Sequence, residues 1–239
     1  MPYADVNGLH LYFEEHGDGP PLVLLHGGLM TIDLNFAVAL PALAERHQVI
    51  AVELQGHGHT ADIDRTPTFP AFAADVVALL DHLGVERADV VGFSLGGLTG
   101  YELVVSHPQR VRRAVLASAD HRNDRAGELD PDRLPTADDY QAMRDAYAAT
   151  APDPGAFDSM AAKTVGLVQS CTGWTDDQLR SVDVPVLILI GDTDFILVDN
   201  AAEAARLLPH GQLAVLPGTT HMGVTRSTLL APVIESFLA

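Results

Sequence analysis

Cysteine is nearly missing from this sequence, which has Cys171 as its one thiol among 239 residues. A single thiol cannot form an internal disulfide, so a disulfide-stapled secreted domain is excluded and a reducing compartment is favoured. Long apolar runs are missing too, because no window reaches the roughly 18 apolar residues that a membrane-spanning helix needs. The N-terminal stretch MPYADVNGLHLYFEEHG has neither a basic segment nor an apolar core, so we do not expect it to be a signal peptide. We therefore expect a cytoplasmic location.

Basic residues are also scarce. The chain has 14 Lys and Arg against 32 Asp and Glu, which gives a formal net charge of −18. A surface of that sign repels nucleic-acid phosphates and anionic lipid headgroups. We therefore expect neither nucleic acid nor a membrane as a partner, while a homodimer stays open. The charge alone does not indicate a substrate.

Short runs rich in branched apolar residues recur along the chain, at 21–27, 47–54, 88–93, 113–119, 184–191 and 211–217. Each run is apolar on both faces, which is typical of parallel strands covered by helices on either side. Helical patterns separate them, at 34–45, 70–84, after the third run, 200–209 and 227–238. This alternation predicts an α/β fold with a doubly wound sheet. Residues 2–6 and 9–15 alternate more strictly and predict an antiparallel hairpin at one edge.

One long segment, from about 121 to 181, shows no strand pattern. Thr136, Asp153 and Thr175 each precede a helix-like stretch, and their side-chain oxygens are suited to cap the free amides of a helix start. The segment is too long to be a simple connection. We predict a small helical cap over 121–181, inserted into a core of 1–120 and 182–239.

A serine between two glycines follows one of the predicted strands. The string Gly92-Phe93-Ser94-Leu95-Gly96 lies where that strand ends and a helical pattern begins. Small residues two before and two after the serine let strand and helix pack closely while the serine occupies a strained corner. The helix N-terminus also favours an oxygen that becomes anionic during acyl transfer. Ser94 is therefore predicted to be a nucleophile, and a helix N-cap in a Gly-rich turn is the alternative.

A serine nucleophile needs a base within hydrogen-bond reach and an acid that orients the base. Of eleven histidines, His221 in VLPGTTHMGV is the candidate because it follows the last predicted strand on a Gly/Thr loop. Asp192 and Asp194 both follow the preceding strand, in LILIGDTDFI. Asp194 is favoured because it lies farther from the strand end and can reach the neighbouring loop, while an aspartate in the other position can cap the turn. Asp192 stays the alternative acid.

Backbone amides must also bind the oxyanion that forms when a serine attacks a carbonyl. The string LLHGGLM places two glycines directly after an earlier strand, where the backbone can turn its N–H groups toward the site. We expect the amide of Gly28, with Leu29 as the alternative, to act together with the amide of Leu95. An ordinary Gly-rich turn is the competing interpretation.

Four motifs together resemble the α/β-hydrolase superfamily over essentially the whole chain: strand-HGG, GFSLGG, GDTD after a strand, and GTTHM near the C-terminus. The chain is most similar to the small single-domain carboxylesterases and cofactor-free haloperoxidases with a helical cap. The resemblance implies an eight-stranded, mostly parallel sheet flanked by helices, with the cap after the sixth strand and no cofactor. It also implies Ser94 as nucleophile, His221 as base and Asp194 as the orienting acid.

Two positions differ from some members of this superfamily, and each difference argues against one or more of its activities. Leu29 follows Gly28 where proline-iminopeptidase-like relatives have a proline, which argues against a peptidase. The nucleophile position holds Ser94 rather than an aspartate, which argues against haloalkane dehalogenases and epoxide hydrolases. Neither departure affects the three predicted catalytic residues.

These residues predict a serine hydrolase that cleaves a small, largely apolar carboxylic ester, lactone or thioester through an acyl-enzyme on Ser94. Two other classes stay open. One is a C–C bond hydrolase, lyase or haloperoxidase-type perhydrolase that uses the same residues, and the other is a noncatalytic ligand receptor on the same scaffold. The expected pocket walls are Leu29, Met30, Phe93, Trp174, Phe195 and Met222. For Trp174, anchoring of the cap is an equally weighted alternative.

A pair of histidines in QGHGHT invites a metal interpretation. His57 and His59 are two residues apart in a loop, but no Cys, Glu or further His stands nearby at ligand spacing. We therefore expect no metal site.

Overall fold

A computed structural model describes residues 2–122 and 131–239. These residues form an eight-stranded sheet with the order β1-β2-β4-β3-β5-β6-β7-β8. The first two strands are antiparallel and form the predicted hairpin at one edge, and the other six are parallel. The strands are β1 Tyr3–Val6, β2 Leu9–His16, β3 Pro21–Leu25, β4 Gln48–Val52, β5 Ala88–Phe93, β6 Val111–Ala117, β7 Val186–Gly191 and β8 Gly211–Leu216. The predicted fold class is confirmed.

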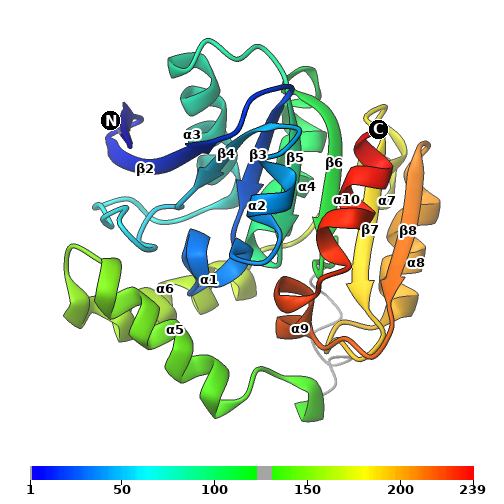
Figure 1. The fold of residues 1–239 in the computed structure, drawn as a ribbon. Helices are drawn as coiled ribbons and strands as arrows, with labels where there is room; N and C mark the ends of the chain where they lie inside the picture. The colour runs from blue at the N-terminus through cyan, green and yellow to red at the C-terminus, as the bar shows by residue number, and fades with distance from the viewer. Residues whose placement is uncertain (1, 123–130) are drawn as a thin grey trace.

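Helices cover both faces of the sheet (Figure 1). The helices are α1 Ile32–Phe36, α2 Leu40–Leu43, α3 Phe69–His82, α4 Leu95–Ser106, α5 Ala137–Thr150, α6 Phe157–Ser170, α7 Asp176–Arg180, α8 Val198–Leu207, α9 His221–Arg226 and α10 Leu230–Leu238. Successive residues of a strand point to opposite faces, so Val90 packs in one apolar core with α3, α4 and α8, and Val91 packs in the other with α1, α9 and α10. This explains why the central strands β5 and β7 are buried at every position.

Helices α5, α6 and α7 lie between β6 and β7, in the described part of that segment. Thr136 forms a capping box with Asp139 at the start of α5, and Thr175 forms one with Gln178 at the start of α7. Asp153 caps the short turn before α6. All three predicted helix starts are therefore present. Figure 1 shows α5 and α6 beyond the carboxyl ends of the parallel strands.

The division into a core and a cap over 121–181 stays a prediction, and residues 123–130 of that segment lie outside the described residues. Among the residues described, no helix is long and apolar enough to cross a membrane.

Two predicted helices differ in detail. The stretch 34–45 forms two short helices, because Thr31 caps α1 early and Pro41, which has no N–H to donate, begins a new turn in α2. The C-terminal helix is preceded by α9, which the pattern over 227–238 did not reveal. Thr220 starts α9 by accepting a hydrogen bond from the Gly223 amide. The short helix α9 matters because His221 is its first residue.

Candidate active site

Ser94 lies at the junction of β5 and α4 with a φ of 52°, in the left-handed region. A side chain at either flanking glycine would collide with backbone: a Cβ on Gly92 would overlap the Gly96 carbonyl, and one on Gly96 would overlap the Leu25 carbonyl. The Ser94 amide donates to the Ala117 carbonyl at the end of β6, 2.8 Å away. The close packing and this bond fix the strained corner on which the hydroxyl is presented.

The Ser94 hydroxyl is the first member of a hydrogen-bonded series. Its Oγ lies 3.1 Å from His221 Nε2, and His221 Nδ1 lies 2.9 Å from Asp194 Oδ1. Both His221 and Asp194 are buried, with 4% and 1% of their surface exposed. An ionised carboxylate only accepts, so Nδ1 donates to Asp194 and Nε2 is left to accept the Ser94 proton. The geometry is that of a nucleophile, its base and an orienting acid.

The two candidate acids have different surroundings. Asp194 receives the His221 ring N–H, whereas Asp192 accepts the Thr219 amide at 3.0 Å. Hydrogen bonds from the backbone of Gly218 and Thr219 hold the pKa of Asp192 below its usual value. Asp192 therefore caps the turn that leads to α9, and the structure brings Asp194, not Asp192, to the histidine.

Both expected oxyanion donors lie at the same end of the sheet as Ser94. Leu95 is the first residue of α4, so its amide is one of the unpaired donors of a helix N-terminus. A Cβ on Gly28 would lie 3.8 Å from Leu95 Cβ, which places the two backbones side by side. Within the described residues neither amide donates to a protein group. Leu29 has a φ of 62°, so this turn is strained as well.

A buried histidine fixes the strand end before this turn. His26 Nδ1 donates to the Gly27 carbonyl at 2.7 Å, and Nε2 accepts from the Leu54 amide at 3.1 Å. Burial, with the nearby His57 ring, lowers the pKa of His26 to about 3. The ring is therefore neutral at neutral pH, with its tautomer set by the two bonds. It ties the loop after β3 to the loop after β4.

The loop after β4 contains the histidine pair that suggested a metal. Burial lowers the pKa of His57 to about 4, and its Nδ1 lies 3.0 Å from the Gln55 carbonyl. His59 lies 2.9 Å from Glu53 instead. Within 2–122 and 131–239 no three His, Cys, Asp or Glu side chains are grouped to bind a metal. Both rings have structural partners in the loop.

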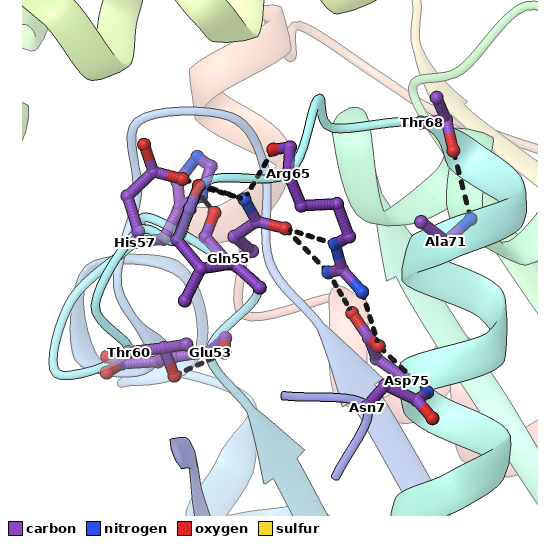
Figure 2. Close-up of polar contacts among 11 residues, drawn as sticks. Asn7, Glu53, Gln55, His57, Thr60, Arg65, Thr68, Ala71 and Asp75 are labelled. Atoms are coloured by element: carbon purple, nitrogen blue, oxygen red, sulfur yellow. Dashed lines mark hydrogen bonds and ion pairs between the residues drawn. The ribbon is translucent and has the colours of Figure 1, made fainter. Parts of the chain in front are cut away.

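The same loop is tied to α3 by an ionic network. Figure 2 shows the Arg65 guanidinium between Gln55 and Asp75. Its Nη2 lies 2.6 Å from Gln55 Oε1 and 2.6 Å from Asp75 Oδ2. Asn7, from the turn of the N-terminal hairpin, donates to Asp75 at 3.0 Å. The network fixes the loop and includes none of Ser94, His221 and Asp194.

The side chains expected to line the pocket fall into two groups. Phe93 and Phe195 contact the His221 ring, with centroids 4.8 and 4.2 Å away. Leu29, Met30 and Met222 are buried in the core cluster that faces α5 and α6. Trp174, also expected to line the pocket, lies in the other core cluster instead.

Trp174 packs against the helices behind the sheet. Its ring stacks on Tyr101 at 5.3 Å and lies 6.0 Å from Phe69, and its Nε1 donates to Glu102 at 3.0 Å. An indole N–H that is buried needs such an acceptor, and α4 supplies one. These contacts correspond to the alternative interpretation, in which Trp174 anchors the segment before α7.

Helix α6 covers the predicted oxyanion turn. A Cβ on Gly28 would lie 3.0 Å from Thr164 Cγ2, so any larger residue here would press against α6. A separate groove of about 390 Å³ lies between the loop 64–67 and α6, with Lys163 and Ser170 among its walls. The turn that contains Gly28 therefore lies against α6.

One polar contact of the site was not anticipated. Ser118, directly after β6, donates its hydroxyl to Asp194 Oδ2 at 2.7 Å. The sequence signal is weak: a serine follows the RAVLASA strand, and only the adjacency of β6 and β7 brings it to the acid.

The chain is similar to known proteins over most of its length. A family model described as the alpha/beta hydrolase fold matches residues 20–172. A non-heme haloperoxidase of Rhodococcus erythropolis is 29% identical, with 92% of this chain and 93% of the relative covered.

Two solved structures share the fold. An enol-lactonase from Burkholderia xenovorans has a TM-score of 0.81 and 23% identity, covering 99% of each chain. A meta-cleavage product hydrolase from Pseudomonas fluorescens has a TM-score of 0.82 and 19% identity, covering 97% of this chain and 94% of the other. With the family match, these findings establish the chain's affiliation: it belongs to the α/β hydrolase fold family and is a hydrolytic enzyme.

Proposed function

We propose that the enzyme is a serine hydrolase that cleaves a small, largely apolar carboxylic ester, lactone or thioester through an acyl-enzyme on Ser94. The observation that carries the proposal is the continuous series from Ser94 Oγ through His221 to Asp194, at 3.1 and 2.9 Å. A serine hydroxyl becomes a competent nucleophile when such a base and acid stand behind it.

The reaction follows from the geometry. Ser94 Oγ attacks the substrate carbonyl while His221 Nε2 takes its proton, and Asp194 stabilises the imidazolium. The amides of Gly28 and Leu95 donate to the oxyanion of the tetrahedral intermediate. His221 then gives its proton to the leaving oxygen or sulfur, which leaves an acyl group on Ser94. A water molecule, activated by the same histidine, releases the acid.

The surroundings of the nucleophile support a small and largely apolar substrate. Phe93 and Phe195 flank the His221 ring, and the cap residues that face this side of the sheet are apolar, among them Met143, Tyr147 and Met160. An apolar wall gives a charged acyl group no partner and so disfavours it. One protein with the same fold is named an enol-lactonase, and lactones are among the proposed substrates.

Perhydrolysis is the second candidate, because the haloperoxidase relative is similar over nearly its whole length. In that reaction hydrogen peroxide replaces water as the attacker of the acyl-enzyme and yields a peracid. The same three residues serve both reactions. An assay with acetate, hydrogen peroxide and bromide distinguishes perhydrolysis from simple ester hydrolysis.

The test is intact mass after incubation with a fluorophosphonate probe. We expect one adduct on the wild type and none on Ser94→Ala. As a matched control, Ser159→Ala removes an exposed hydroxyl on α6 and should be labelled like the wild type. If the wild type takes up the probe, fresh unlabelled protein is then screened with p-nitrophenyl esters of increasing chain length, where short acyl chains should react fastest. Folded wild-type protein that takes up no adduct would overturn the proposal.

A further inference from the structure

The carboxylate of Asp194 is bound at both oxygens. Oδ1 accepts from His221 Nδ1 at 2.9 Å and from the Ile196 amide at 3.0 Å. Oδ2 accepts from the Ser118 hydroxyl at 2.7 Å, and Ser118 is 1% exposed. The two oxygens therefore have different tasks: Oδ1 faces the histidine, and Oδ2 is anchored by the hydroxyl on the neighbouring strand end.

The backbone at Ser118 is unusual. Its φ is 51°, in the left-handed region that residues other than glycine rarely occupy. The Ser118 amide donates to the Leu189 carbonyl of β7 at 2.8 Å, and the preceding carbonyl, of Ala117, accepts the Ser94 amide. The end of β6 thus contacts the nucleophile through its backbone and the acid through a side chain. A glycine would fit this backbone better, so the serine side chain is present despite a conformational cost.

We propose that Ser118 is a positioning residue, whose hydroxyl fixes the Asp194 carboxylate with Oδ1 toward His221 and stabilises its negative charge. The inference rests on the proposed function, because it assigns a role within the same site. Ser118 touches neither the nucleophile side chain nor the substrate position, and it acts through Asp194.

Two consequences follow from removing the hydroxyl. The carboxylate can turn about its Cβ–Cγ bond, so Oδ1 is less often in line with Nδ1. A buried anion that loses a donor also becomes costlier, so the His221–Asp194 pair binds a proton more readily. The acidic limb of the rate profile must therefore move to higher pH, since the base is active only when the pair has released that proton.

Other charged groups near the pair are unchanged by a substitution at Ser118. Arg133 lies 3.4 Å from the backbone carbonyls of Asp192 and Asp194. Charged side chains on the neighbouring segments include Asp192 after β7, Asp33 on α1, Arg226 on α9, which is paired with Asp139, Asp120 after β6, which accepts from Asn200, and Asp199, Glu203 and Arg206 on α8. These groups act equally on wild type and variants, so a shift between them reports the hydroxyl.

The experiment compares two substitutions with opposite properties. Ser118→Gly removes the hydroxyl and relieves the backbone, whereas Ser118→Thr keeps the hydroxyl and worsens the backbone because its side chain is β-branched. The measured quantity is the second-order rate constant for labelling of Ser94 by a fluorophosphonate, between pH 5 and 9, together with Tm. This readout does not require the natural substrate.

We expect Ser118→Gly to label about 10- to 100-fold more slowly, with the acidic limb moved up by roughly 0.5 to 1 pH unit and Tm close to wild type, because the relieved backbone offsets part of the lost hydrogen bond. Ser118→Thr should keep the wild-type midpoint with a lower Tm. If labelling follows Tm instead, so that the glycine variant matches or exceeds the wild type at every pH, Ser118 has no positioning role.

A second readout covers the case in which the threonine variant does not fold. The Nδ1 proton of His221, hydrogen-bonded to Asp194, gives a low-field proton resonance in NMR. In Ser118→Gly and Ser118→Ala the pH at which this signal titrates should rise, and an unchanged titration would overturn the inference. Failure of the proposed function has a different signature, because wild-type Ser94 would then remain unlabelled while the NMR comparison still reports on Ser118.

Discussion

Replacing each of the two neighbouring aspartates by asparagine separates their roles. In Asp194→Asn the side-chain oxygen can still accept from His221 and Ile196, and the new NH2 group can donate to the Ser118 oxygen. The shape of the site is kept and only the charge is lost. In Asp192→Asn the amide oxygen can still accept from the backbone of the turn before α9.

The expected size of the first effect follows from the geometry. The Nδ1–Oδ1 distance is 2.9 Å, and the charge centres of the imidazolium and the carboxylate are somewhat farther apart. Two unit charges about 4 Å apart attract by about 4 kcal/mol at an effective dielectric of about 20. That energy corresponds to roughly a 10³-fold loss of rate, and any fraction of the wrong His221 tautomer raises the loss toward about 10⁴-fold.

The assay is the rate of fluorophosphonate labelling at pH 8, followed by intact mass, with Tm as the control for folding. Asp192→Asn should label within about threefold of wild type, because its hydrogen bonds to the turn are retained. Equal losses in the two variants at unchanged Tm would refute the assignment of Asp194. So would an Asp194→Asn variant that labels at the wild-type rate.

Two further predictions concern the attachment of the helices between β6 and β7. Trp174→Phe removes the indole donor to Glu102, so thermal unfolding should show a free energy of unfolding lower by about 1 kcal/mol. The rate of ester hydrolysis should stay within about twofold of wild type. A large loss of activity at unchanged Tm would show that Trp174 does line the pocket. Burial raises the pKa of Asp139, but hydrogen bonds from Thr136 and the charge of Arg226 outweigh it, so the net pKa lies below the usual value. The stability that Asp139 contributes is therefore present above its unfolded pKa of about 3.9 and is lost as pH falls through the lower folded pKa. Asp139→Asn should flatten the acid dependence of urea unfolding below about pH 4, and an acid limb identical to wild type would contradict this.

Much of the site could be predicted from local patterns. The position of Ser94 depends on a strand–turn–helix corner that only small neighbours permit, and Gly92 and Gly96 carry that signal in the sequence. His221 was identifiable because it follows the last strand. Asp194 was favoured over Asp192 by reach alone, and the structure brings it to the histidine.

Other features depend on three-dimensional adjacency. Ser118 is an ordinary serine in the sequence, and its role appears only because β6 and β7 are neighbours in the sheet. Trp174 had two equal interpretations because its partners, Tyr101 and Glu102, lie far away in the chain on α4. The start of α9 at His221 was hidden because its cap, Thr220, belongs to a loop-like GTT string.

The order of strands has a consequence for when the enzyme acquires its reactivity. Gly28, Ser94, Ser118, Asp194 and His221 follow β3, β5, β6, β7 and β8, five strands that are consecutive across the sheet. Ser94 and His221 are 127 residues apart in sequence, so their contact forms only after the last strand has joined. Under the proposed function, a chain still being synthesised, or a fragment that lacks its final segment, has an inert serine. The proposed nucleophile therefore becomes reactive only late in folding, after the last strand has been added to the sheet.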